Sequence, residues 1–183
     1  MASGRLGDAH PPARTRASLH HASLALTADH PNVARVRAYA AERAIDLPVK
    51  RFTATTRTAE DAAREIGTDV ERIVKSLVFV NAEEPVVVLC SGRDRVDERL
   101  LAEALGVSAV RRATADEAKA FTGYAIGGVP PFAHAQPCRV IADEGLLGFD
   151  EVWAAAGLPD AVFPIAPREL VRIAEAQVAR IAS

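Results

Sequence analysis

Lys75-Ser76-Leu77-Val78-Phe79-Val80 and Val86-Val87-Val88-Leu89-Cys90 are the two stretches of sequence that decide the fold. Both are rich in the β-branched and aromatic residues that favour strands. Only the turn-like residues 81–85 separate them. A connection this short joins antiparallel neighbours, so the sequence predicts a β-hairpin with a single charge, Lys75, at its mouth.

Two helices and a short strand are predicted upstream of this hairpin. The first helix begins at Pro31 and ends before Pro48, with its apolar residues on one side. Residues 49–53 are predicted to form a short strand. The second helix runs from its cap at Thr58 to a stop at Gly67.

Capping residues mark two more helices downstream, over residues 97–106 and 114–121. Residues 123–137 contain too many glycines and prolines for regular structure. A last helix is predicted to begin at Pro167 and to continue to Ile181. Three further strands are predicted over residues 138–142, 151–156 and 161–165.

These elements predict one mixed α/β domain of the α+β kind, with a mostly antiparallel sheet flanked by helices. Of the 183 residues, 49% are hydrophobic, enough for one core. Residues 1–28 are rich in Ala, Arg, Ser, His and Pro without a sustained period, and we predict a disordered N-terminal extension there. The domain is expected over residues 29–183.

Composition narrows the class of protein. The net charge is −2 with neutral histidines, which argues against a protein that coats many phosphates, although not against one that touches the end of an RNA strand. Cys90 and Cys138 lack the number and spacing of a disulfide framework or a zinc site. No apolar run suggests a membrane span or a signal peptide, so a cytoplasmic protein is expected.

Two features could carry chemistry. Lys75 shares a strand face with Leu77 and Phe79, so it either extends its ammonium group to water or presents a fixed cation to an anionic ligand. The segment Gly123–His134 contains a Gly-Gly-Val-Pro-Pro run. It is either a tight structural turn or a loop that aims backbone N–H groups at a carbonyl or oxyanion.

Six segments of the sequence resemble one known family in order and spacing. They are RTAEDAA (57–63), IVKSLVF (73–79), SGRDRVD (91–97), GGVPPF (127–132), IADE (141–144) and FDEVWAAAG (149–157). The family is that of the YbaK and prolyl-tRNA synthetase-associated editing domains, and the resemblance spans roughly residues 30–175. It implies a curved, mostly antiparallel sheet flanked by helices.

The resemblance also implies an activity: a free-standing trans-editing hydrolase that deacylates mischarged aminoacyl-tRNA at its 3′ end, on tRNA(Pro) or related tRNAs. The essential lysine of the family maps onto Lys75, and its substrate loop onto Gly127, Gly128, Val129, Pro130 and Pro131. Lys75 is expected to hold the terminal adenosine end, and amides of residues 127–129 the carbonyl. A ribose hydroxyl of the substrate is expected to help activate water, so that neither a cofactor, a metal nor a protein base is required. An aminoacyl-tRNA synthetase is a further expected partner, whereas DNA and membranes are not.

Further residues near these segments have two interpretations each. Ser76 contacts substrate or points into the sheet. His134 acts as a pocket gate or proton carrier, or packs in the loop. Asp143 orients loop amides, or caps a helix or turn.

Two rival functions stay open: a module that binds aminoacyl or nucleotide ends without hydrolysis, and a hydrolase dependent on Cys138. His134 and Cys138 are too few for a zinc site, and a thiol nucleophile would still need a base. A packed, inert Cys138 is the simpler interpretation. The amino acid removed is left undetermined among alanine, serine, threonine and cysteine.

Overall fold

The computed structural model describes residues 29–53, 58–82 and 84–183. The extension predicted for residues 1–28 lies outside these residues. The helices are α1 (Pro31–Ala41), α2 (Ala59–Ile66), η1 (Val70–Arg72), α3 (Glu98–Leu105), α4 (Ala115–Thr122), η2 (Glu144–Gly148) and α5 (Pro167–Ile173). The strands are β1 (Lys50–Arg51), β2 (Val74–Asn81), β3 (Glu84–Ser91), β4 (Arg111–Arg112), β5 (Arg139–Asp143), β6 (Val152–Ala155), β7 (Ala161–Ile165) and β8 (Gln177–Ala179).

The predicted hairpin forms the centre of the larger sheet. Strands β2 and β3 pair antiparallel from Val74–Ser91 to Asn81–Glu84. They lie in a five-stranded sheet of order β4-β2-β3-β5-β8, in which β5 runs parallel to β3 and β8 runs parallel to β5. The antiparallel hairpin prediction is confirmed.

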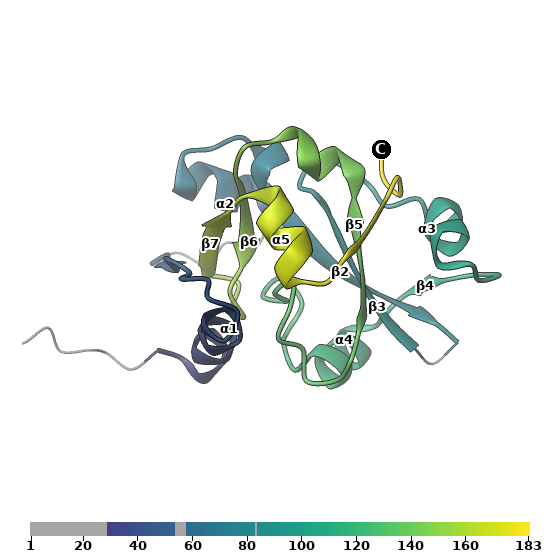
Figure 1. The fold of residues 1–183 in the computed structure, drawn as a ribbon, viewed down its shortest axis with the longest axis horizontal. Coiled ribbons are helices and arrows are strands. Elements are labelled where there is room, and N and C mark those ends of the chain that lie inside the picture. Colours follow the sequence, from purple (N-terminus) through teal and green to yellow (C-terminus); the bar gives the residue numbers. More distant parts are fainter. Residues whose placement is uncertain (1–28, 54–57, 83) are drawn as a thin grey trace, which may run out of the picture.

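A second, three-stranded antiparallel sheet has the order β1-β7-β6. A parallel bridge between Ile73 and Trp153 joins it to the start of β2. Figure 1 shows β6 and β7 on one side of α5, and β3 and β5 on the other. Among the described residues, four of the six strand pairs are antiparallel. The mixed, mostly antiparallel class is confirmed, with the strands divided between two sheets.

Both faces of the larger sheet are buried. Alternate residues of β3 point to opposite sides, as the pleat requires: Val87 and Leu89 join the main core with α1 and α5, whereas Val86 and Val88 pack with Leu101 of α3. A strand that is buried on both faces has a continuous apolar sequence, and residues 86–90 show this pattern.

The helix caps predicted from sequence are present. The Thr58 hydroxyl accepts from the Asp61 amide at the start of α2. Asp97 caps α3, and Thr114 forms a full capping box with Glu117 at α4. Gly67 ends α2 in a left-handed conformation with φ of 80°.

The last predicted helix is wrong beyond Ile173. Helix α5 ends there, Glu175 takes a positive φ of 51°, and residues 177–179 then pair as strand β8 with β5. Val178, which the apolar spacing of the predicted helix places on its buried side, is 39% exposed. Ile181 is buried as predicted, but it packs on the α3 face of the larger sheet rather than on a helix. The apolar spacing suits a helix, and pairing with the free edge of β5 overrides it.

Candidate functional site

A cavity of about 260 Å³ lies where the two sheets meet. Its walls come from α2, the start of β2, strands β6 and β7, and the loop after α4. The wall is mainly apolar. The lining residues are Thr58, Ala59, Ala62, Ile73, Val74, Lys75, Ser76, Leu77, Ile126, Gly127, Val129, Trp153, Ala155, Pro159 and Val162.

Among the described residues that line this cavity, Lys75 is the one ionisable side chain. It is half-buried, and its Nζ donates a hydrogen bond to the carbonyl oxygen of Asp94. The segment that carries Asp94 lies close to η1 because residue 92 is glycine: a Cβ there would lie 2.3 Å from the Val70 carbonyl oxygen. No carboxylate among the described residues pairs with Lys75. An ammonium group has three donors, so two are left for a ligand.

Ser76 also lines the cavity. Its hydroxyl oxygen is buried and has no hydrogen-bond partner in the described part of the chain. The Ser76 hydroxyl therefore places a polar atom without a protein partner at the cavity wall.

The loop contributes Ile126, Gly127 and Val129 to the cavity. Gly127 has φ of 89°, a conformation that favours glycine. Gly128 is buried, and a Cβ there would lie 2.8–3.0 Å from the backbone of Leu158. Glycine is therefore required at both positions, at 127 for its φ and at 128 for its close packing.

The Gly128 amide is already engaged within the loop. This N–H closes a turn by donating to the carbonyl of Ala125 at 3.0 Å. Gly127 and Val129 have amides that donate to no other described residue. Two of the three expected amides thus make no hydrogen bond within the part of the chain that the structure describes.

A set of hydrogen bonds holds the ends of this loop together. Arg35 Nε donates to the Tyr124 hydroxyl at 2.7 Å, and that hydroxyl donates to the carbonyl of Ala133 at 2.9 Å. His134 Nε2 lies 2.8 Å from the carbonyl oxygen of Pro130, so the neutral ring donates there through an Nε2–H. The loop is thereby fixed against α1 and the core.

Several predicted site residues of the loop do not line the cavity. Pro130 and Pro131 are buried and absent from the lining. His134 lines a different hollow, with Tyr39 and Cys138. Burial lowers the pKa of His134 below 6.5, against the raising effect of its bond to Pro130. Of the two interpretations of His134, the structure shows loop packing.

Asp143 is likewise outside the cavity lining. It is 4% exposed; its Oδ1 accepts from the amide of Gly145 at 2.9 Å, and its Oδ2 from those of Ile181 and Ala182 at 2.9 and 3.0 Å. Both oxygens are used in holding η2 and the C-terminal segment. The cap interpretation of Asp143 is therefore the one that the structure shows.

Neither cysteine lies in the lining of the cavity. Burial raises the pKa of both thiols to about 11. The Cys138 thiol donates to the carbonyl of Gln136. Because the thiolate is the nucleophile, a raised pKa speaks against the Cys138-dependent hydrolase.

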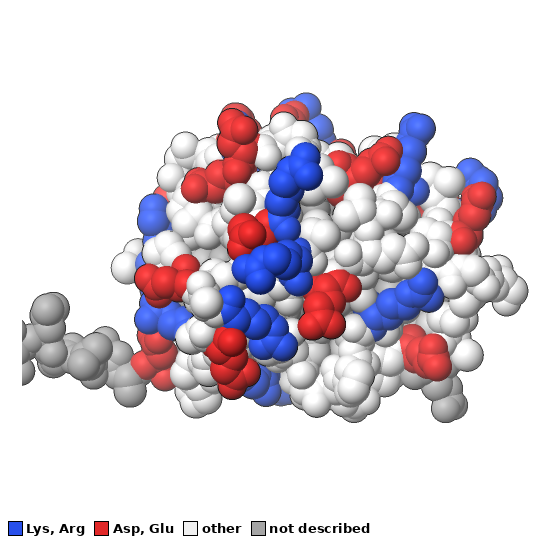
Figure 2. Space-filling view, viewed as in Figure 1, with Lys and Arg blue, Asp and Glu red and all other residues white. Residues whose placement is uncertain are grey.

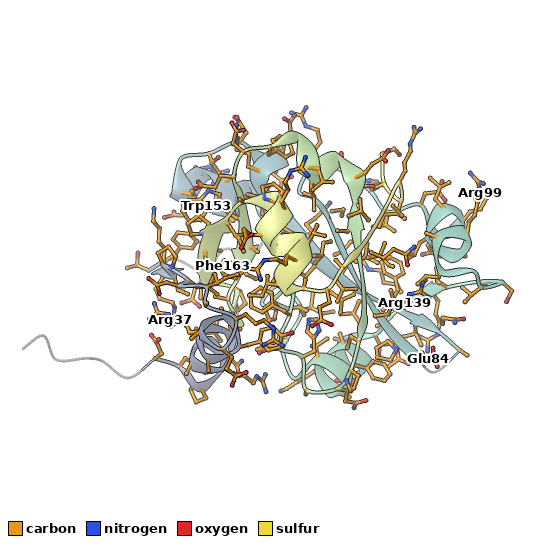
Figure 3. The ribbon with its side chains drawn as sticks, in the orientation of Figure 1. Arg37, Glu84, Arg99, Arg139, Trp153 and Phe163 are labelled. Carbon is orange, nitrogen blue, oxygen red and sulfur yellow. The ribbon has the colours of Figure 1, made fainter. Side chains whose placement is uncertain are left out.

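Trp153 is the site residue that sequence reasoning missed. It is 8% exposed and forms part of the cavity wall, at the bridge that joins the two sheets. Figure 3 labels it on β6 together with Phe163 of the neighbouring strand β7. Trp153 lies in one of the segments that carry the family resemblance. The sequence of that segment does not place Trp153 beside β2; the contact between the two sheets does.

Charged side chains of both signs are interspersed on the face shown in Figure 2, without a broad patch of one sign. Within the described residues, no helix combines the length and the apolar character that crossing a membrane would require.

Residues 53–173 match the family model described as the aminoacyl-tRNA editing domain, and the chain belongs to this family. Solved structures share the fold. The crystal structure of a proposed trans-editing enzyme for prolyl-tRNA synthetase is 41% identical with a TM-score of 0.80, covering 85% of this chain and 99% of that one. A hypothetical protein of known structure is 31% identical with a TM-score of 0.76, covering 81% and 99%.

Two curated relatives differ in length. The uncharacterised YwhH protein of Bacillus subtilis is 32% identical over 123 residues, 67% of this chain and 78% of YwhH. The proline–tRNA ligase of Ligilactobacillus salivarius is 36% identical over 101 residues, which are 54% of this chain but 18% of the ligase. The shared part is thus most of a free-standing protein in one case and a minor segment of a synthetase in the other.

Proposed function

We propose that this protein hydrolyses the ester bond of mischarged aminoacyl-tRNA, with tRNA(Pro) as the substrate tRNA, in the cytoplasm. The observation that carries the proposal is the shared cavity: Lys75 and the loop residues Gly127 and Val129 line the same space. Similarity to prolyl-tRNA synthetase editing proteins supports the choice of tRNA.

Each polar group of the cavity has a role in this proposal. The Lys75 ammonium group holds the terminal adenosine end and orients the ester. Its hydrogen bond to the carbonyl of Asp94 fixes the position of the ammonium group, so that its other donors point to the substrate. The Ser76 hydroxyl gains in the complex the hydrogen bond that it lacks here. The amides of Gly127 and Val129 face the ester carbonyl.

The reaction needs no covalent intermediate. A water oxygen attacks the carbonyl carbon, and negative charge develops on the carbonyl oxygen. The bond to the ribose oxygen then breaks, and that oxygen takes up the proton that water has lost, leaving free amino acid and tRNA. The protein contributes positioning and charge stabilisation, and the cavity wall excludes bulk water.

Lys75→Ala tests the proposal directly. We expect deacylation of the best mischarged tRNA in a panel of alanyl, seryl, threonyl and cysteinyl species to fall at least about 100-fold, the usual cost of a lost electrostatic group in such a site. Lys119→Ala, an exposed lysine on α4 outside the cavity, is the matched control and should keep full activity.

The measurement is release of labelled amino acid under single-turnover conditions. Near-normal hydrolysis by Lys75→Ala would contradict the proposed site. A wild-type protein that binds charged tRNA without releasing amino acid would instead be the non-catalytic binding module.

A further inference from the structure

Lysine is rare in this chain: Lys50, Lys75 and Lys119 are the only three among 22 basic residues. Lys75 lines the cavity from β2. Lys50 comes from the other sheet, on the short edge strand β1. Its place relative to the cavity follows from the strand register.

Lys50 lies directly opposite Val162 of β7, and Val162 lies directly opposite Ala155 of β6. Residues that are directly opposed across antiparallel strands project from the same sheet face. Val162 and Ala155 both line the cavity. Lys50 therefore projects from the cavity face of this sheet and continues the row at its edge.

One contact and one missing ion pair distinguish Lys50 from an ordinary surface lysine. Its Nζ lies 4.7 Å from the ring centroid of Trp153, which is itself part of the cavity wall. Lys50 is exposed, and no carboxylate of residues 29–53, 58–82 and 84–183 forms an ion pair with it. The result is a solvent-accessible cation without a counter-charge at the rim of the cavity.

The next residue shows the opposite arrangement. Arg51 lies opposite Ala161, which belongs to the main core, and so projects from the other sheet face. Its guanidinium group is paired with Asp160 at 2.6 Å. Two adjacent basic residues thus differ in both direction and charge compensation.

We propose that Lys50 binds a backbone phosphate of the single-stranded 3′ end of the aminoacyl-tRNA, at a subsite distinct from Lys75. The inference rests on the proposed function. A ligand whose terminal adenosine lies against Lys75 must leave the cavity as a polyanion, and a cation at the rim without a carboxylate partner attracts that anion. Trp153 holds the ammonium group at the rim through its ring face.

The test compares substrates with and without a phosphate. One is the 3′-aminoacylated trinucleotide CCA, and the other is 3′-aminoacyl-adenosine, which has no phosphodiester. Lys50→Met should lower kcat/KM for the trinucleotide by roughly tenfold, through KM, as expected for one lost charged hydrogen bond. It should leave hydrolysis of aminoacyl-adenosine unchanged. With charged tRNA, the salt dependence of log KM should weaken by about 0.7 per decade of salt.

Arg51→Met is the matched control and should leave kcat/KM unchanged for both substrates. The Arg51 side chain faces away from the cavity, and Asp160 neutralises its charge. For Lys50→Met, equal losses of kcat/KM with both substrates, or no loss with the trinucleotide, would overturn the phosphate subsite.

A binding measurement separates this inference from the proposed function. Trp153 is the only tryptophan of the chain, so its fluorescence reports on ligands at this rim. Uncharged CCA should bind more tightly than adenosine to the wild type, and Lys50→Met should abolish the difference. If no charged substrate is hydrolysed, the proposed function fails, whereas this titration still decides whether Lys50 binds phosphate.

Discussion

Gly128 shows how one residue controls the geometry of the site. Its amide closes a turn with Ala125, and its missing side chain lets the loop contact the backbone of Leu158. The neighbouring Gly127 and Val129 then face the cavity. The orientation of the two free amides thus depends on a residue that does not itself line the cavity.

Gly128→Ala should therefore damage both stability and activity. The added Cβ meets backbone rather than a flexible side chain, so the loop must move, at a cost of about 1–3 kcal/mol in the free energy of unfolding. Deacylation should fall because Gly127 and Val129, which line the cavity together with Lys75, move with the loop. Urea unfolding and single-turnover hydrolysis measure the two effects.

Gly148→Ala is the control for this substitution, because a Cβ at residue 148 has open space around it. An unchanged unfolding free energy for Gly128→Ala would show that the loop packing is looser than the structure indicates.

At the scale of elements, the loop between α4 and β5 is held by the side chains of Tyr124 and His134. His134 is half-buried and donates to Pro130, and burial lowers its pKa. The unfolded chain therefore binds a proton more readily than the folded protein does. The stabilisation from this neutral ring is present above pH 6.5 and is lost as pH falls from there through the lowered folded pKa.

Acidification should accordingly lower the folding stability of the wild type more than that of the His134→Gln variant. We expect the free energy of unfolding of the wild type to decrease between pH 7.5 and pH 5.5, and the same decrease to be smaller in the variant, which has no imidazole to protonate. Glu117 does not interfere, because its lowered pKa of about 2 places its titration below this window. Parallel pH profiles for the two proteins would rule out His134 as the group responsible.

At the scale of the whole molecule, charge limits how much of a tRNA the protein can hold. The net charge is −2, and acidic and basic side chains alternate on the face in Figure 2. Many phosphate contacts would require a basic surface. The structure instead offers Lys75 in the cavity and Lys50 at its rim.

Recognition should thus be confined to the end of the acceptor arm. The slope of log affinity against log salt should be about −0.7, as for the one single-stranded phosphate that Lys50 contacts. A charged acceptor-stem minihelix should be hydrolysed within about threefold of the full tRNA, since few contacts reach beyond it. A slope near −6, or loss of activity on the minihelix, would indicate a broad RNA-binding surface.

Local patterns predict much of the fold. The hairpin at residues 74–91 follows from β-branched runs joined by a short turn, and the caps at Thr58, Asp97 and Thr114 from single side chains that bond nearby amides. The C-terminal segment does not follow from such patterns. Residues 177–179 have an apolar spacing that suits a helix, yet they form β8 on the edge of β5.

The sequence by itself determined the α/β class, the hairpin with Lys75 at its mouth and the need for glycine near residue 127, because each of these depends on neighbours in the chain. The tertiary structure alone decided which residues share the cavity. It joined the two sheets at Trp153, used the Gly128 amide to close a turn, and engaged Asp143 and His134 in structural hydrogen bonds. The reason is physical. A cavity wall is built from side chains remote in sequence, and their directions depend on strand register and burial, which no local pattern records.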